Sequence, residues 1–278
     1  MRLLEPFAGS AVVSLVATRA LPPRGVLAPY QGGKGRFADR ILQAMGIHER
    51  PTRVVLTDPG PWGRVWEVLP TRRAEVATLI RAMLEEDAGD LYARLSAAQV
   101  PEDGAEYVAA FLALQAIHWR SMAVGEAGHF VVRGFSATHG YGIPHSDGFG
   151  EVQPQLPALA RKVRRIRLDH VAGHRASALT FDFDPRPGDY AFIDAPYSGT
   201  QPYGPHDPTR EQVVDLALRL ADAGVRVAMS EAEPVRCEPF CRWVKVGEKG
   251  KSSGLTDAPR SEWLSLSWSD EQLSWLPP

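Results

Sequence analysis

The stretch Gly188–Gly204, GDYAFIDAPYSGTQPYG, constrains the fold of this chain more than any other segment. Its apolar run Tyr190–Ile193 follows a turn signal at 187–189 and is typical of a short buried strand. The strand must end near Asp194, because Pro196 cannot donate a hydrogen bond to a neighbouring strand. We therefore expect a carboxylate, a carbonyl and an aromatic ring together at the carboxyl end of a strand, where ligands bind in open α/β sheets.

The residues after this strand suit chemistry at an exocyclic amino group. The amino nitrogen of adenine is a weak nucleophile because its lone pair is delocalised into the ring. A carboxylate and a backbone carbonyl that each accept one N–H hold this nitrogen and raise its electron density, while an aromatic ring stacks on a flipped base. Asp194, the Ala195 carbonyl and Tyr197 supply these three parts. A tight proline turn without a catalytic role is the alternative interpretation of so short a motif.

The segment resembles motif IV of amino-directed DNA methyltransferases, specifically the adenine-N6 enzymes with the pattern G-D-hydrophobic-D-P-P-Y-x-G-T-x-x-Y. This chain has Ala195 where the family has proline. The family uses that residue through its backbone carbonyl, so alanine keeps the acceptor and loses the rigidity of the ring. The resemblance implies methyl transfer from S-adenosylmethionine to the N6 amino group of adenine in DNA. It implies that the catalytic residues are Asp194, Ala195, Pro196 and Tyr197.

The N-terminal segment predicts a binding turn for a nucleotide-like ligand. Residues 3–9, LLEPFAG, indicate a strand that runs into a glycine turn, and residues 11–19 indicate a helix with Ser10 as its N-cap. A strand, a turn of small residues and a helix N-terminus form a pocket for a polar or anionic group. The segment resembles motif I of the same family, E-P-F-x-G-x-G, with Ala11 at the second glycine. The implied cofactor contacts are Glu5, Pro6, Phe7, Gly9 and Ser10.

Two further blocks extend the resemblance. In Pro29–Phe37, PYQGGKGRF, a glycine pair precedes a helix, so the backbone can approach a ligand and Lys34 supplies a cation. This block resembles motif X, W-x-G-G-K, which implies cofactor contacts from Tyr30 and Lys34; in familiar members it precedes motif I, whereas here it follows. The run Arg53–Thr57 predicts a second strand, and Asp58 matches the family acid that binds ribose hydroxyls.

DNA contacts are expected from local patches, because the net charge of −2 does not by itself indicate nucleic-acid binding. The strongest patch is the basic run 161–167, for which a solvated helix or strand face is the alternative. The glycine- and aromatic-rich loop 123–150 loosely resembles the target-recognition region of the family, and the loop 245–260 is basic. The predicted DNA-contacting residues are Arg120, Arg133, Tyr141, Arg161, Lys162, Arg164, Lys249 and Lys251.

The alternation of strand-like and helical segments predicts an α/β protein with a Rossmann-like methyltransferase fold. Residues 1–70 and 160–278 are expected to form the catalytic domain around one mostly parallel sheet, and residues 71–159 a helical and loop insert for target recognition. The cofactor is expected to lie between the N-terminal turn and Asp194. Near the C-terminus, the pattern predicts a helix over 209–223 closed by Gly224, a strand over 225–229, and an edge or hairpin strand over 261–268.

Composition narrows the class of protein further. No apolar run approaches the roughly 20 residues of a membrane span, and the N-terminus lacks a secretion signal pattern. Two cysteines, Cys237 and Cys241, are too few for a zinc site or a disulfide framework, and neither follows a proline as carbon-5 cytosine methylation requires. We therefore expect a cytoplasmic protein of a bacterial or phage-infected cell, without metal, acting on double-stranded DNA as a monomer or weak dimer.

Other functions stay open at this stage. Cytosine-N4 methylation is the nearest chemically, although that reaction usually has serine where this chain has Asp194. A second alternative is the same fold acting on another amino substrate or transferring another group, and a third is a DNA-binding protein that has lost catalysis. The departures at Ala11, at Ala195 and at Gly60, which follows Asp58 where the family has the pattern D-x-N, favour these two alternatives. The retained residues Asp194, Tyr197, Lys34 and Asp58 favour an active enzyme.

Overall fold

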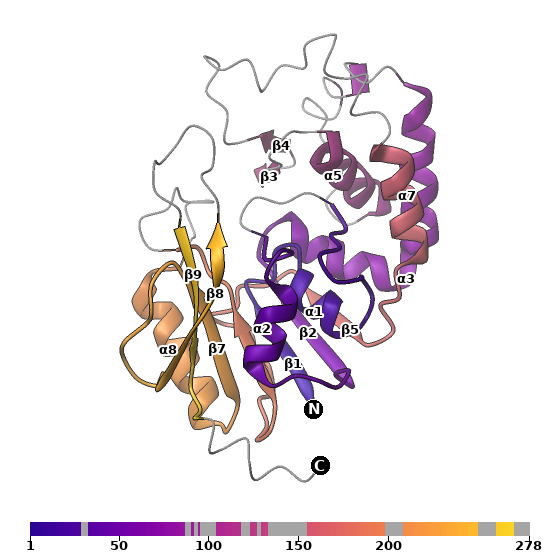
Figure 1. Cartoon of the computed structure of the whole chain (residues 1–278). Coiled ribbons are helices and arrows are strands. Elements are labelled where there is room, and N and C mark those ends of the chain that lie inside the picture. The colour runs from indigo at the N-terminus through magenta and orange to yellow at the C-terminus, as the bar shows by residue number, and fades with distance from the viewer. Residues whose placement is uncertain are drawn as a thin grey trace.

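The fold is a layered α/β structure around one large mixed sheet (Figure 1). The computed structural model describes residues 1–28, 33–86, 90–91, 94, 104–117, 123–126, 129–132, 155–197, 208–249 and 260–269. The sheet has seven strands in the order β5-β2-β1-β6-β7-β9-β8. The predicted α/β class with a mostly parallel, Rossmann-like sheet is confirmed.

The strands are short, and those in the centre of the sheet run parallel. Their bounds are β1 Arg2–Pro6, β2 Arg53–Thr57, β5 Val171–His174, β6 Tyr190–Ile193, β7 Arg226–Glu231, β8 Arg242–Lys249 and β9 Arg260–Leu266. β5, β2, β1, β6 and β7 pair in parallel, whereas β9 pairs antiparallel with both β7 and β8. β9 thus forms the expected hairpin with β8. Of the two predicted positions for 261–268, edge or hairpin, the hairpin is the one found, and β8 is the outermost of the described strands.

The central strands are buried on both faces, which explains their unbroken apolar sequences. Along β6, Tyr190 and Phe192 belong to one apolar core, and Ala191 and Ile193 belong to the other. Helices α1, α2, α3, α5 and α7 contribute to the first core, and α8 contributes to the second. Their bounds are α1 Val12–Ala17, α2 Ala38–Met45, α3 Pro61–Ala82, α5 Ala105–Ile117, α7 Gln155–Arg165 and α8 Arg210–Asp222.

A group of helices stands beside the sheet, formed by α3, α5 and α7 packed against one another (Figure 1). The predicted domain boundaries at 70/71 and 159/160 fall inside α3 and α7, and α3 is kinked at Arg72 just after Pro70. A short 3₁₀ helix, η1 Met83–Glu85, follows α3, and β3 Ala123–Glu126 pairs antiparallel with β4 His129–Val132. Within the described ranges, no helix is long and apolar enough to cross a membrane.

Helix α8 shows how closely local sequence signals can specify an element. Thr209 caps its N-terminus by accepting a hydrogen bond from the Gln212 backbone, and the Gln212 side chain accepts one from the Thr209 N–H in return. At the other end, Gly224 adopts the left-handed conformation with φ 81°, which favours glycine. The predicted helix over 209–223 and its closure by Gly224 are confirmed.

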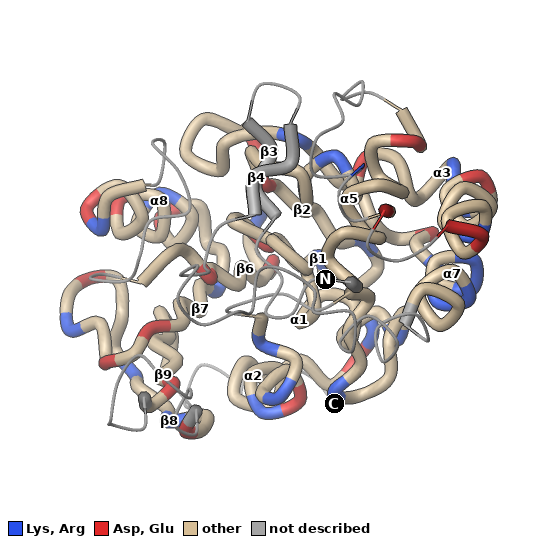
Figure 2. The backbone as a smooth tube through the Cα atoms, turned by 90° about the horizontal axis from the view of Figure 1, so that it is seen from above, with Lys and Arg blue, Asp and Glu red and all other residues tan. Residues whose placement is uncertain are grey.

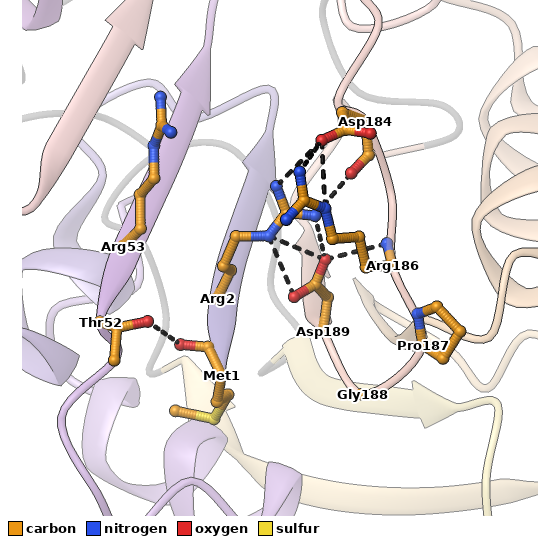
Figure 3. Close-up of a pocket in the computed structure, with 9 residues that line it drawn as sticks. All are labelled: Met1, Arg2, Thr52, Arg53, Asp184, Arg186, Pro187, Gly188 and Asp189. Atoms are coloured by element: carbon orange, nitrogen blue, oxygen red, sulfur yellow. Dashed lines mark hydrogen bonds and ion pairs between the residues drawn. The ribbon is translucent and has the colours of Figure 1, made fainter.

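The amino ends of β1 and β6 are joined by an ion pair at the edge of the sheet opposite the predicted site (Figure 3). Arg2 Nε lies 3.1 Å from both carboxylate oxygens of Asp189. Gly188, with φ 86°, forms the turn that brings Asp189 to this position. A depression of about 660 Å³ lies here, lined by this pair and by Arg53, Asp184 and Arg186 among others. The Gly-Asp start of the 188–204 segment therefore has a structural role, separate from the chemistry predicted for its end.

Candidate active site at the carboxyl edge of the sheet

The carboxyl ends of β1 and β6 lie side by side in the middle of the sheet. Leu3 pairs with Tyr190 and Leu4 with Ala191, so the turn after β1 faces the residues after β6. At this point the strand order reverses, because β2 and β5 lie on one side of β1 and β7 lies beyond β6. In open α/β sheets the usual ligand site lies at the carboxyl edge beside such a reversal. The motif-like segments after β1 and β6 therefore converge on one edge.

Glu5, near the end of β1, binds the first turn of α1. This side chain is buried, and its Oε2 accepts a hydrogen bond from the backbone N–H of Ser14 at 3.1 Å, in the first turn of α1. The N-cap of α1 is Ala11, with no side-chain cap of its own, so the prediction of Ser10 as N-cap is wrong. Glu5 takes over that capping function from the preceding strand. Burial raises the pKa of Glu5 to about 8.

The same turn is fixed to the end of β2 through Asp58. Its carboxylate accepts hydrogen bonds from the backbone N–H of Gly9 at 3.0 Å and of Gly60 at 2.8 Å. The indole N–H of Trp66 donates to the Gly9 carbonyl at 2.7 Å, which holds the turn from α3. Burial raises the pKa of the Asp58 carboxyl. The residues implied as cofactor contacts at Gly9 and Asp58 are thus in direct contact.

The turn after β1 has a backbone conformation that favours glycine at several positions. Phe7, Gly9 and Ala11 have φ values of 58°, 46° and 48°, all in the left-handed region that favours glycine. The resemblance places glycine at Ala11, and the backbone of this chain has the conformation that glycine adopts most easily. The alanine substitution therefore keeps the shape of the turn at the expense of local strain.

Asp194 forms the centre of a buried polar cluster at the end of β6. Its Oδ1 accepts a hydrogen bond from Ser230 Oγ at 2.7 Å and forms an ion pair with Lys34 Nζ at 2.6 Å. The Lys34 side chain is 3% exposed and that of Asp194 is 19% exposed, so the carboxylate retains some access to solvent. Both contacts go to Oδ1, and no residue within the described ranges donates to Oδ2. One oxygen of Asp194 is thus fixed by the protein, and the other is available to a ligand.

Tyr197 and Glu262 complete this cluster. The Tyr197 hydroxyl donates a hydrogen bond to Oε1 of Glu262, a side chain of β9 that is fully buried. Lys34 Nζ lies 4.7 Å from the centroid of the Tyr197 ring, in a cation–π contact. Burial raises the pKa of Tyr197, and the carboxylates of Asp194 and Glu262 raise it as well, so the phenol stays protonated near neutral pH. The aromatic ring is therefore held from its hydroxyl and from one face.

Lys34 keeps its charge despite its burial. Burial by itself lowers the pKa of an ammonium, but Asp194, Tyr197 and Glu262 outweigh that effect and raise the pKa of Lys34 above its ordinary value. Its Nζ lies 3.6 Å from Glu262 Oε1, in addition to the closer contact with Asp194. The cluster therefore sets one ammonium against two carboxyl groups.

The turn that carries Lys34 packs closely against β8. Phe37, which follows Lys34 in the turn before α2 and donates its N–H to the Lys34 carbonyl at 2.8 Å, packs against Gly247 of β8. A Cβ on Gly247 would lie 2.3 Å from Phe37 Cε1. Gly247 pairs with Glu262 across the β8–β9 hairpin. The absence of a side chain at Gly247 therefore lets the Lys34 turn lie against the strand that carries Glu262.

Ser230 and Glu262 are members of the cluster that the sequence analysis did not select. Ser230 follows the predicted strand 225–229 and ends β7 together with Glu231, whose carboxylate pairs with Arg210 at 2.9 Å. Glu262 alternates with Leu264 and Leu266, which are buried in the core. A carboxylate in register with apolar residues of one strand is a sequence signal for a buried functional or structural ion pair.

Arg161, Lys162 and Arg164, which the sequence predicts to contact DNA, do not join this cluster. These three residues lie on the exposed side of α7, whose Leu159 and Val163 are buried, and the Lys162 ammonium donates to the Val26 carbonyl at 3.0 Å. Figure 2 shows the blue positions of α7 at the periphery, to the side of β1 and β6. Lys249 is the last residue of β8. The candidates Tyr30, Arg120, Arg133, Tyr141 and Lys251 lie outside the described residues.

Two comparisons with known proteins found no relative of this chain. No protein-family model matches the chain, and no curated protein matches it. Among the described side chains, no group of three or more His, Cys, Asp or Glu residues is placed to hold a metal ion.

Proposed function

We propose that this protein transfers a methyl group from S-adenosylmethionine to the N6 amino group of adenine in double-stranded DNA. One observation carries the proposal: the three blocks that resemble motifs I, X and IV meet at one edge of the sheet. The turn 5–10 lies beside the end of β6, and Lys34 Nζ lies 2.6 Å from Asp194 Oδ1. The blocks are far apart in the sequence, so their convergence supports a shared function.

The described residues fit S-adenosylmethionine. The turn 5–10 and the carboxylate of Asp58 offer backbone and side-chain groups for the polar parts of the nucleoside, because a carboxylate oxygen can accept more than one hydrogen bond. The Asp194 cluster sets two carboxyl groups against one ammonium, so the carboxyl groups offset the repulsion between Lys34 and a positively charged sulfonium. When bound, this cofactor would supply the electrophilic methyl group.

The residues after β6 would prepare the amino group for attack. Asp194 Oδ2 would accept one N–H of adenine and the Ala195 carbonyl the other, which localises the nitrogen lone pair toward the methyl group. Lys34 and Ser230 fix the opposite oxygen of Asp194 and so hold the carboxylate in one orientation. The Tyr197 ring would stack on the flipped base. Positioning of the two reactants supplies much of the acceleration in a direct transfer of this kind.

DNA would be bound through contacts to its phosphates. On and just after α7 the exposed basic residues are Arg161, Lys162, Arg164, Arg165 and Arg167, and no ion pair to a carboxylate is formed by them within the described part of the chain. Positive charge without a carboxylate partner is available to phosphates. A DNA substrate also implies a location in the cytoplasm.

Nucleoside analysis tests this proposal. The purified protein is incubated with S-adenosylmethionine and DNA that lacks modified bases, and the digested nucleosides are identified by mass. We expect N6-methyladenine with the wild type and its loss with Asp194→Asn, whereas Asp184→Asn, at an exposed carboxylate, serves as the control. N4-methylcytosine or another modified base would replace the adenine assignment with one of its alternatives. No modified base with cofactor bound would overturn the proposal.

A further inference from the structure

The turn after β1, residues 7–11, has a strained backbone that depends on contacts from the rest of the molecule. Phe7, Gly9 and Ala11 lie in the left-handed region, with φ values of 58°, 46° and 48°. Residues that carry a side chain are unfavourable in this conformation, and they persist in it only where surrounding contacts determine it. Without those contacts the turn would relax to other conformations.

Contacts from the end of β2 hold one side of the turn, and α3 holds the other. The backbone N–H groups of Ala8 and Gly9 donate to the Thr57 carbonyl at 2.9 Å and to Asp58 at 3.0 Å. The Gly9 carbonyl accepts the indole N–H of Trp66 at 2.7 Å, and no other described side chain donates to it. Gly9 and Trp66 are both buried, so solvent is a poor substitute for this hydrogen bond.

Two glycines outside the motif-like blocks let α3 approach closely enough for this contact. A Cβ on Gly173 of β5 would lie 2.3 Å from Trp66 Cβ. A Cβ on Gly63, in the first turn of α3, would lie 1.9 Å from the Asp58 carbonyl oxygen. Glu67, the residue after Trp66, accepts the backbone N–H of the residue that follows β5 at 2.7 Å. Helix α3 is thus fixed to the ends of β2 and β5, and from there Trp66 reaches the turn after β1.

We propose that Trp66 is a positioning residue for cofactor binding, which keeps the turn 7–11 in the conformation that receives S-adenosylmethionine. This inference rests on the cofactor of the proposed function. Trp66 acts through the Gly9 carbonyl, from a helix that none of the motif-like blocks includes. A protein that populates its receptive conformation only in part binds more weakly, by the fraction populated. Loss of the indole N–H therefore raises the apparent Kd for the cofactor.

The test makes the same substitution at two buried tryptophans. Trp66→Phe removes the indole N–H and keeps an aromatic ring. Trp268→Phe is the matched control, because Trp268 is 2% exposed in the same apolar core and its indole N–H has no acceptor within the described part of the chain. Calorimetric titration with S-adenosylmethionine measures Kd for both variants and the wild type. We expect Kd to rise about tenfold in Trp66→Phe only, which corresponds to the loss of one hydrogen bond.

Trp66→His separates the hydrogen bond from the packing. The Nε2 of histidine has the same place in its ring as the indole nitrogen, so a neutral imidazole keeps a donor for the Gly9 carbonyl and loses the benzene part of the side chain. We expect Trp66→His to unfold at a lower temperature than Trp66→Phe and yet to bind S-adenosylmethionine more tightly. A purely structural Trp66 gives the opposite order, with affinity following stability, and that order would overturn the inference.

A measurement on the wild type decides the question if Trp66→Phe does not fold. Hydrogen exchange of the Trp66 indole N–H reports local opening of its contact with Gly9. A saturating amount of S-adenosylhomocysteine should slow this exchange, because the ligand favours the held turn. Exchange that the ligand leaves unchanged would show that Trp66 and cofactor binding are not coupled.

The proposed function and the role of Trp66 fail in different ways. A wild type that binds no S-adenosylmethionine defeats both. A wild type that binds the cofactor and leaves DNA unmodified defeats the proposed function alone, because the Kd values still decide the role of Trp66. A wild type that methylates adenine, with Trp66→Phe binding the cofactor as tightly, defeats the role of Trp66 alone.

Discussion

Asp189 and Asp194 flank the same strand, β6, and each carboxylate binds a cation from elsewhere in the chain. Asp189 pairs with Arg2 at the amino edge of the sheet, whereas Asp194 pairs with Lys34 at the carboxyl edge. The first pair joins the starts of two neighbouring strands, and the second lies at their carboxyl ends. A structural role follows for Asp189, and the chemical role that we propose belongs to Asp194.

Amide substitutions at these two positions form a matched pair. Asp194→Asn removes the charged acceptor for the target amino group, and we expect it to lower methyl transfer by about 10² or more with cofactor binding largely retained. Asp189→Asn weakens the link to Arg2, and we expect it to lower the free energy of unfolding by about 1–3 kcal/mol with kcat retained. Urea unfolding and kcat are measured on both proteins. Equal losses of kcat in the two variants would contradict the division of roles.

Ala195→Pro is expected to leave methyl transfer intact or to raise it. The substitution keeps the carbonyl that would accept the second N–H, and it stiffens the turn. No described residue accepts a hydrogen bond from the Ala195 N–H, so the sheet does not need that donor. Initial rates with saturating DNA and cofactor measure the effect. A loss of activity would mean that the site is adapted to alanine, and it would favour a substrate other than ordinary adenine.

The raised pKa of Glu5 predicts an unusual dependence of stability on pH. Its pKa is raised from an ordinary 4.5 to about 8, so between these values the folded protein holds a proton that the unfolded chain does not. The contribution of Glu5 to the free energy of unfolding is therefore fully present below pH 4.5 and is lost as pH rises through 8. Glu5→Gln, which cannot ionise and still offers an acceptor to Ser14, should be more stable than the wild type at pH 9, by about 2 kcal/mol or more.

Denaturant unfolding at pH 5 and pH 9 checks this prediction. The difference in free energy of unfolding between Glu5→Gln and the wild type should be small at pH 5 and should grow toward pH 9. Glu75→Gln is a useful control, because Glu75 is an exposed carboxylate whose pKa is lowered by Arg72. A difference that stays constant over this pH range would show that Glu5 is not protonated in the folded protein.

Gly247→Ala should disturb the site, because Gly247 of β8 packs against the turn that carries Lys34. The added Cβ would lie 2.3 Å from Phe37 Cε1, so the turn that carries Lys34 must shift. We expect the free energy of unfolding to fall by about 1–3 kcal/mol, as in other overpacked cores, and kcat to fall with it. Phe37→Leu in the same chain should recover part of both losses, because it removes the ring that the new methyl group meets. Absence of recovery would exclude this contact as the cause.

The elements with complete local signals were predictable from the sequence. The apolar run of β6 lies between a glycine turn and a proline, and its bounds of Tyr190–Ile193 agree with the prediction. Helix α8 carries its cap at Thr209 and its stop at Gly224. In both cases the residues that determine the bounds are neighbours in the chain, so propensity and turn chemistry suffice. The position of Asp194 at a strand end follows from the same local pattern.

The partners of Asp194 and Tyr197 were decided only by the tertiary structure. Glu262 reaches Tyr197 because β9 inserts between β7 and β8, a strand order that the sequence of β9 does not encode. The cap of α1 likewise comes from Glu5 of the preceding strand, whereas local chemistry favoured Ser10. Sheet order is set by the summed packing of distant segments, and only that packing determines which buried charges meet. The sequence thus determined the proposed catalytic motif and its place on a strand, and the tertiary structure decided the network that holds it.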